Sequence, residues 1–233
     1  MHALITGASR GIGLAIAERL ATQHGAQLSL CARSEPDLLA ARNGIESRTS
    51  SKVFTAVCDV TSERDIARLA EDAQKAFGPI DLLVNNAGIG IFRPVQEMTS
   101  VEFDQVLAIN LRGVFLMTQA VLPQMKQHKS GTIVTIGSLA SKNGFAGGAA
   151  YCASKFGVRG LMQSLFLEVR AFDIRVMTIF PGTVETEFFH SNEPSKITRP
   201  LQAEDIAEAV AAVIHLPPRA TISELDIRPT NPK

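Results

Sequence analysis

The stretch TGASRGIG at residues 6–13 decides the fold of this chain. It joins a short apolar run to an amphipathic one, which predicts a tight turn from a strand into a helix. Gly7 permits the turn, Gly11 lets the backbone approach a diphosphate, and Gly13 lets the helix pack close to the sheet. The N–H groups at a helix start favour an anion. The stretch therefore predicts a dinucleotide-binding turn, although its spacing differs from the commoner G-x-G-x-x-G.

Two other interpretations of the same turn exist. Residues 7–11 also fit G-x-S-x-G, the nucleophile elbow of hydrolases, with Ser9 as nucleophile. Only six residues precede Gly7, so no earlier loop is present to supply a second oxyanion donor. A glycine-rich turn without a ligand is the second alternative, and it leaves three costly glycines unexplained.

Short apolar runs alternate with longer amphipathic runs on either side of this turn. The alternation predicts one α/β domain over residues 1–233, a Rossmann fold with a doubly wound, seven-stranded parallel sheet and helices on both faces. The expected strands are Ala3–Thr6, Gln27–Ala32, Val53–Cys58, Leu82–Val84, Thr132–Ile136, Val176–Ile179 and Ile222–Ile227. The expected helices are Ile12–Gln23, Pro36–Ser47, Glu63–Phe77, Val101–Lys126, Ala149–Ala171 and Ala203–His215.

Composition narrows the function classes. The chain has 23 basic and 23 acidic residues, and this neutral balance disfavours nucleic acid as a partner. No apolar run approaches ~18 residues and no signal peptide is apparent, so we expect no membrane span and a cytoplasmic location. The three cysteines form no C-x-x-C motif, so we expect them to be packing residues of a protein in a reducing compartment. The histidines lack the spacing of metal ligands, so we expect no metal site.

The end of the second expected strand bears on the choice of cofactor. An NAD-binding unit places an acidic residue there to accept from the ribose 2′-hydroxyl. This chain has Arg33 and Ser34 instead, and Arg10 and Ser9 of the glycine turn can converge on the same point. Because guanidinium suits forked contact with a phosphate, the sequence favours NADP(H) over NAD(H). The alternatives are Glu35 as an NAD-type ribose acceptor and Arg33 as a solvated surface residue.

Tyr151 and Lys155 carry the expected chemistry. They are four residues apart at the start of a helical pattern, so their side chains share one face. A free phenol has a pKa near ~10, and a neighbouring ammonium is expected to lower it. The pair then forms a proton donor for a carbonyl or an acceptor for an alcohol. An ordinary surface pair on a helix is the alternative.

Polar residues follow several expected strands, where ligands bind in such sheets. Ser138 can hydrogen-bond a substrate oxygen or simply cap a turn. Residues 85–88, NNAG, let the backbone lie beside a nucleotide or form a surface turn. Asp59 can contact an adenine amine or cap a helix. Asn110, inside a helical pattern, can hold a water leading to Lys155 or be an exposed polar residue.

Taken in order, these motifs, with Pro181-Gly182, resemble the short-chain dehydrogenase/reductase family over essentially the whole chain. The resemblance implies that Tyr151 is the general acid/base, that Lys155 lowers its pKa and binds the nicotinamide ribose, and that Ser138 orients the substrate oxygen. It also implies a water relay at Asn110. With the residues argued above, the expected cofactor-binding set is Gly7, Ser9, Arg10, Gly11, Ile12, Gly13, Arg33, Ser34, Asp59, Val60, Asn86, Ala87, Gly88, Tyr151, Lys155, Pro181, Val184 and Thr186.

The implied reaction is hydride transfer between NADP(H) and a small carbonyl or secondary alcohol. The family's substrate lid corresponds to the short segment 187–202, and the branch resembled acts on small hydroxy acids, pterins or similar carbonyls. The resemblance also implies a homodimer or homotetramer, packed through the helices around Asn110 and Tyr151. Possible pocket walls are Leu139, Phe145, Ile91, Phe92, Phe188, Phe189 and His190.

Two other functions stay open at this stage. A 3-oxoacyl-carrier-protein reductase needs a basic patch near the site for its acidic partner, and the candidates are Lys126, Lys129, Arg170 and Arg175. A nucleotide-sensing module without turnover needs no catalytic residues. This chain has all four that the resemblance implies, which are Asn110, Ser138, Tyr151 and Lys155. Neutral net charge disfavours the first alternative, and the intact set of catalytic residues disfavours the second.

Overall fold

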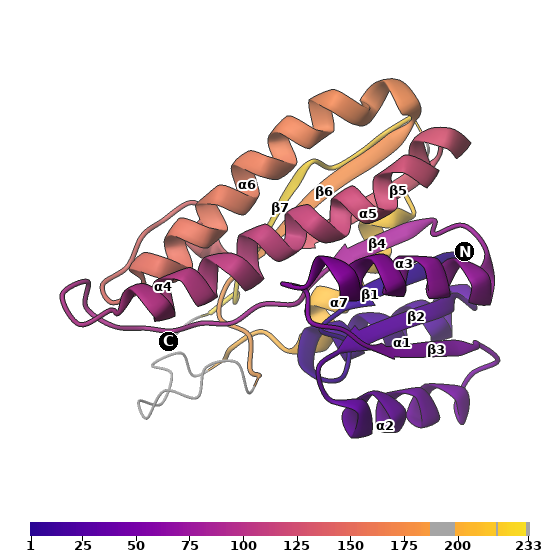
Figure 1. Cartoon of the computed structure of the whole chain (residues 1–233), viewed down its shortest axis with the longest axis horizontal. Helices are drawn as coiled ribbons and strands as arrows, with labels where there is room; N and C mark the ends of the chain where they lie inside the picture. Colours follow the sequence, from indigo (N-terminus) through magenta and orange to yellow (C-terminus); the bar gives the residue numbers. More distant parts are fainter. Residues whose placement is uncertain (187–198, 218, 232–233) are drawn as a thin grey trace.

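The computed structural model describes residues 1–186, 199–217 and 219–231. Its seven strands form one parallel sheet in the order β3-β2-β1-β4-β5-β6-β7 (Figure 1). The order reverses between β1 and β4, and this is where such sheets bind ligands. The expected doubly wound sheet is therefore confirmed. The strands are β1 (His2–Thr6), β2 (Gln27–Ala32), β3 (Val53–Val57), β4 (Leu82–Asn85), β5 (Gly131–Ile136), β6 (Ile174–Pro181) and β7 (Glu224–Ile227).

Helices cover both faces of the sheet (Figure 1). Helices α1, α2 and α7 bury apolar side chains against one face, and α3, α5 and α6 against the other. Two layers of helix thus enclose near-continuous apolar strands, as expected for a parallel sheet. The helices are α1 (Gly11–His24), α2 (Glu35–Glu46), α3 (Glu63–Phe77), α4 (Ser100–Leu107), α5 (Gly113–His128), α6 (Ala149–Val169) and α7 (Ala203–Ile214), with the short turns η1 (Ala108–Arg112), η2 (Leu139–Ser141) and η3 (Arg170–Phe172).

Strand β6 is longer than the apolar run that predicts it. It begins at Ile174, which pairs with Gly131 of β5, and it ends at Pro181, which pairs with Ile227 of β7. A strand between two partners is extended by the ladders on both sides, and this does not register in its own hydrophobic pattern. The longer strand brings the segment after Pro181 to the carboxyl edge of the sheet.

The single helix expected over residues 101–126 is instead α4 and α5 joined by the π-helical turn η1. This turn takes in one more residue than an α-turn, since Gly113 N–H bonds to the carbonyl of Ala108. Asn110 lies in it and is only 1% exposed. The turn therefore directs an amide side chain inward at a point where a regular helix pattern predicts none.

The continuous helix Ser100–His128 is long and apolar enough, by length and composition, to cross a membrane. The segment contains no unbroken apolar run of ~18 residues, so its sequence alone does not predict a membrane span. In the structure α5 packs against the sheet and buries Leu116, Met117 and Val121. Core helices of globular domains share these features, so the hydropathy of the helix is explained by its place in the fold.

Candidate active site

Thr6 and Asn86 join the loops that follow β1 and β4. The Thr6 hydroxyl accepts hydrogen bonds from the N–H groups of Asn86 and Ala87, both at 3.0 Å. The Asn86 side-chain amide donates to the carbonyls of Thr6 at 2.9 Å and of Gly7 at 3.1 Å. These four bonds fix the two loops to each other at the switch point. This role of Thr6 is not predictable from the sequence, because its partners lie about 80 positions away.

Two glycines of the turn are required by this arrangement. Gly7 has φ +63°, and a Cβ there would lie 2.9 Å from Ala87 Cα. At Gly13 a Cβ would overlap the carbonyl oxygen of Gly7 and lie 2.5 Å from Asn86 Nδ2. The tight turn and the close helix packing expected of Gly7 and Gly13 are thus present. The close contact at Gly13 is with the loop itself rather than with the sheet.

The N-terminus of α1 has the features of an anion site. Its N-cap, Arg10, makes no side-chain capping bond, and its first turn contains no acidic residue. The backbone N–H groups of Gly11, Ile12 and Gly13 therefore face outward at the positive end of the helix dipole. Thr186 lies over them, with its Cγ2 3.7 Å from the position of a Gly11 Cβ. This cradle fits the diphosphate of a dinucleotide.

Arg33 follows β2 at the same edge of the sheet. It is exposed, and it makes no hydrogen bond or ion pair with the other described residues. The neighbouring Ser34 is the N-cap of α2, and its hydroxyl accepts from the N–H of Asp37 at 3.5 Å. Glu35 is the first residue of α2 and is also exposed. The guanidinium is therefore available for an external anion, whereas the Ser34 hydroxyl already has a structural bond.

Asp59 and Val60 form the turn after β3. One carboxylate oxygen of Asp59 accepts from both the N–H and the hydroxyl of Thr61 at 2.8 Å. Val60 is buried beneath the start of α5, where a Cβ on Gly113 would lie 3.1 Å from it. The alternative that Asp59 caps a helix is wrong, because Ser62 is the N-cap of α3 and Asp59 closes the turn that leads to it.

Tyr151, Lys155 and Ser138 come together at the end of β5. Tyr151 and Lys155 are both 6% exposed. The Lys155 ammonium donates to the carbonyl of Ile136 at 3.0 Å and lies 5.7 Å from the centre of the Tyr151 ring. Ser138 accepts from the N–H of Ala140 at 3.1 Å and is hydrogen-bonded to the Tyr151 phenol. Because this bond lowers the pKa of the phenol, Ser138 donates its proton to the phenol oxygen.

Burial has the largest effect on both ionisable groups. It raises the pKa of Tyr151 to about 12, and the Ser138 bond lowers this pKa only in part. It also lowers the pKa of Lys155 to about 8. The Tyr151 pKa is therefore raised in the chain by itself, not lowered as its pairing with Lys155 predicts, because loss of hydration of the phenolate is the stronger effect. At neutral pH the phenol holds its proton beside a mostly charged ammonium, as a proton donor requires.

These values predict the pH dependence of carbonyl reduction. A lysine pKa of about 8 means that the ammonium is present below that pH and lost above it, while Tyr151 stays protonated throughout. We expect kcat/KM to be level from about pH 6 and to fall above about pH 8. Steady-state rates measured up to about pH 10 test this. Tyr151 is the only tyrosine, so phenolate absorbance reports its state independently; a level profile, or absorbance appearing with the fall, contradicts the assignment to Lys155.

Asn110 connects the loop after β4 to the start of α6. Its Oδ1 accepts from the N–H of Ile89 at 2.8 Å, and its Nδ2 donates to the Ile89 carbonyl at 2.9 Å and to Ser154 Oγ at 3.0 Å. Ser154 in turn donates to the Tyr151 carbonyl at 2.7 Å. Both amide hydrogens are thus engaged, and the exposed-residue alternative is wrong. Ser154 was missed, although its place three residues after Tyr151 puts it on the same side of the helix.

The segment after β6 lies beside the glycine turn. Pro181 ends the strand, and Val184 pairs with Leu201, where Glu185 N–H donates to the Leu201 carbonyl at 2.8 Å. At the other end of the segment, Thr186 contacts Gly11 of the glycine turn. The expected wall residues Phe188, Phe189 and His190 lie outside the described residues.

Two of the other expected wall residues, Phe92 and Phe145, lie near Tyr151. Phe92 meets Tyr151 with ring centres 5.5 Å apart, and Phe145 lies 5.8 Å from Phe92. Leu139 lies 3.5 Å from the position of a Gly182 Cβ, and Ile91 is half-buried. The side chains of Phe92 and Phe145 therefore continue outward from the phenol as one apolar surface.

The basic residues considered for a carrier-protein partner lie at the amino ends of the strands, whereas Ser138 follows the carboxyl end of β5. Lys126 and Lys129 lie at the end of α5, just before β5 begins at Gly131. Arg170 and Arg175 flank the start of β6, and Arg175 donates to Thr132 at the start of β5 and to the α7 end at Ile214 and Leu216. Six strand residues, roughly 20 Å, separate this edge from Ser138. The expectation that they lie near the site is wrong, because α5 and α6 run antiparallel to the strands.

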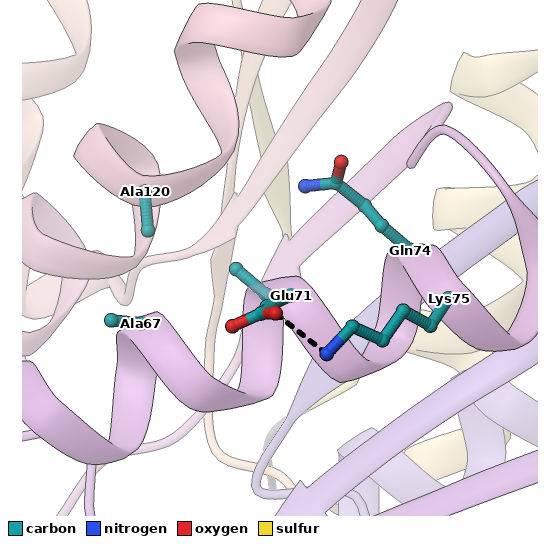
Figure 2. Close-up of a pocket in the computed structure, with 6 residues that line it drawn as sticks. Ala67, Glu71, Gln74, Lys75 and Ala120 are labelled. Carbon is teal, nitrogen blue, oxygen red and sulfur yellow. Dashed lines mark ion pairs between the residues drawn. The ribbon is translucent and has the colours of Figure 1, made fainter.

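Two surface hollows are lined by residues other than the expected catalytic ones. One, of about 540 Å³, is between α3 and α5, where Glu71 and Lys75 form an ion pair at 2.6 Å beside Ala120 (Figure 2). The other, of about 500 Å³, is lined by α4, η1, α5 and α6, including Leu107, Leu111 and Phe115. None of the expected catalytic residues lines either hollow.

Comparisons with known proteins agree with this geometry. The family model described as short chain dehydrogenase matches residues 1–196. Sepiapterin reductase of Chlorobaculum tepidum is 35% identical over 235 residues, covering 98% of this chain and 96% of that protein. The alcohol dehydrogenase of Thermococcus sibiricus, solved with 5-hydroxy-NADP, is 32% identical with a TM-score of 0.90, covering 97% and 95% of the two chains. A metagenomic short-chain oxidoreductase solved with NADP is 38% identical with a TM-score of 0.87, covering 99% and 97%.

Proposed function

Since this chain belongs to the short-chain dehydrogenase/reductase family, we propose that it reduces a small carbonyl compound to a secondary alcohol with NADPH, and catalyses the reverse with NADP⁺. One observation carries the proposal. A buried, protonated phenol is hydrogen-bonded to Ser138 and lies one helical turn from Lys155, at the edge of the sheet where the glycine turn opens. This is the arrangement that proton transfer to a carbonyl oxygen requires.

The catalytic residues act on the substrate oxygen. When substrate is bound, the Ser138 hydroxyl turns its one proton from the phenol to the substrate oxygen and holds that oxygen beside the Tyr151 hydroxyl. Tyr151 gives its proton to that oxygen as negative charge develops there, and a raised pKa keeps this proton in place at neutral pH. The Lys155 ammonium favours the phenolate that remains. Asn110 and Ser154 hold the start of α6, so that the phenol keeps its position.

The residues present fit a bound NADP(H). The N–H groups that open α1 would hold the diphosphate, and Arg33, with Ser9 and Arg10, would hold the 2′-phosphate. Residues 86–88, Asp59 and Val60 would line the adenosine half, and Pro181, Val184 and Thr186 the nicotinamide half. When bound, the reduced nicotinamide supplies the hydride, and the protein supplies position and electrostatics.

The direct test is NADPH oxidation by the purified chain with a panel of carbonyl compounds, repeated with NADH. We expect turnover of at least one compound, faster with NADPH. Tight NADPH binding without oxidation by any compound would support a nucleotide-sensing module instead. A carrier-protein reductase would prefer a carrier-bound oxoacyl group, with rates that fall as salt screens the encounter. The basic residues at the far edge of the sheet do not favour that alternative.

We also propose that the chain forms a homodimer or homotetramer through α4, α5 and α6. Phe115 and Phe156 are 44% and 46% exposed on these helices, and the second hollow lies among them. Large exposed aromatic side chains at one face are typical of a subunit interface. Light scattering should give twice or four times the monomer mass of 25.0 kDa, and a monomer at assay concentration would contradict the proposal.

A further inference from the structure

A third apolar cluster lies apart from the two cores that cover the sheet. It consists of Ala140, Tyr151 and Cys152, and Phe92 packs against it. The Phe92 ring meets Tyr151 edge to face, with an interplanar angle of 66°. Phe145 extends the row and is 49% exposed. An aromatic wall, formed by Phe92 and Phe145, thus begins at the phenol and ends in solvent.

Backbone contacts hold this aromatic wall in place. The N–H of Arg93, which follows Phe92, donates to the Gly147 carbonyl at 2.8 Å and so links the loops that carry the two rings. The Phe145 ring packs directly on the backbone of Gly148, where a Cβ would lie 2.5 Å from it. A Cβ at that position would displace the ring. The wall is therefore preformed, which reduces the entropy cost of binding a ligand against it.

Two cationic residues close in sequence to Phe92 and Phe145 form ion pairs with carboxylates. Arg93 pairs with Glu102 at 2.8 Å. Lys142 pairs with Asp226 at 2.5 Å and with Glu224 at 3.3 Å. A substrate carboxylate beside the wall would lose hydration without gaining either of these charges. The Lys155 ammonium near Tyr151 is 6% exposed and already donates to the Ile136 carbonyl. The wall therefore suits an uncharged group.

We propose that this aromatic wall makes the enzyme select uncharged carbonyl compounds that carry a flat aromatic or conjugated ring beside the carbonyl group. A flat ring can stack on, or meet edge to face, the Phe145 and Phe92 rings while its carbonyl oxygen reaches Tyr151 and Ser138. A saturated ring of the same size buries similar area but lacks this pairing. The inference rests on the proposed reductase function, and it disfavours oxo acids and hydroxy acids as substrates.

Three ketones separate ring flatness from charge. Acetophenone and cyclohexyl methyl ketone differ in the ring, whereas acetophenone and phenylglyoxylate differ in the carboxylate. We expect kcat/KM with NADPH to be about three- to tenfold higher for acetophenone than for the cyclohexyl compound, and higher than for phenylglyoxylate. Phe145→Leu should reduce the first ratio to about one, and Phe145→Tyr, which keeps the ring, should retain it. Phe172→Leu is the matched control, because that ring lies at the far edge of the sheet against Lys126.

The outcomes distinguish this inference from the function on which it rests. Equal rates for the two uncharged ketones, or a ratio unchanged in Phe145→Leu, would overturn the inference and leave the reductase function intact. Faster turnover of phenylglyoxylate would overturn it as well. No oxidation of NADPH by any carbonyl compound would overturn both. If Phe145→Leu does not fold, the wild-type ratio and the Phe145→Tyr ratio decide the question.

Discussion

Replacing Tyr151 with phenylalanine should lower kcat for carbonyl reduction about 10²- to 10⁴-fold, the usual contribution of a general acid. The phenol oxygen accepts a bond from Ser138 and is the proton donor in the proposed reaction. The ring itself packs against Phe92, and the variant keeps that contact. The loss should therefore appear in kcat, while the KM for NADPH changes little. Stopped-flow or steady-state NADPH oxidation measures both.

The control for this variant is a measurement of folding and of cofactor binding. Circular dichroism and NADPH fluorescence should match the wild type, because the bonds that hold the glycine turn join Thr6 to Asn86. The only tyrosine is removed, so the phenolate absorbance of the wild type must disappear in the variant. If Tyr151→Phe keeps wild-type turnover, another group supplies the proton and the proposed function loses its central observation.

Replacing Arg33 with leucine should raise the KM for NADPH roughly 10- to 100-fold, the effect of losing one or two bonds to a charged group. Arg33 is exposed and has no bond to other described residues, so its removal breaks no contact within the part of the chain that the structure describes. The KM for NADH should stay within about threefold, since NADH lacks the 2′-phosphate. Parallel titrations with the two coenzymes measure the change in preference.

Arg42→Leu is the matched control for Arg33→Leu. It removes the same charge from the same region, but its guanidinium is paired with Glu46 at 3.1 Å on α2. We expect little change in either coenzyme constant. Equal losses in both arginine variants would mean that overall charge, rather than a phosphate contact, governs NADPH binding. A wild-type preference for NADH would overturn the role assigned to Arg33 and would favour Glu35 as a ribose acceptor.

Much of the fold follows from periodicity within single segments. The apolar runs predicted the seven strands and the amphipathic runs predicted the helices, with errors at the ends of β6 and β7. Those errors arise where the length of a strand depends on its neighbours. The π-turn at Asn110 was not predicted because its pattern of apolar residues resembles an ordinary helix.

The candidate site was predicted only as far as local spacing allows. Tyr151 and Lys155 share a helix face, and Ser138 follows a strand, so their meeting at one edge follows from the fold class. The contacts that position them were not predictable. Thr6 meets Asn86 across 80 positions, and Asn110 meets Ser154 across 44. The basic residues near β5 and β6 lie at the amino ends of the strands, away from the expected site, because α5 and α6 run antiparallel to the strands.

The sequence by itself determined which chemical groups the chain has and the order in which strands and helices present them, since hydrophobic period and glycine spacing are local properties. Tertiary structure alone decided how those groups ionise. Burial raises the pKa of the Tyr151 phenol and lowers that of the Lys155 ammonium, against the effect expected from their spacing. The physical reason is hydration: the water lost around a charged group depends on everything packed over it, and residues far apart in the chain provide that packing.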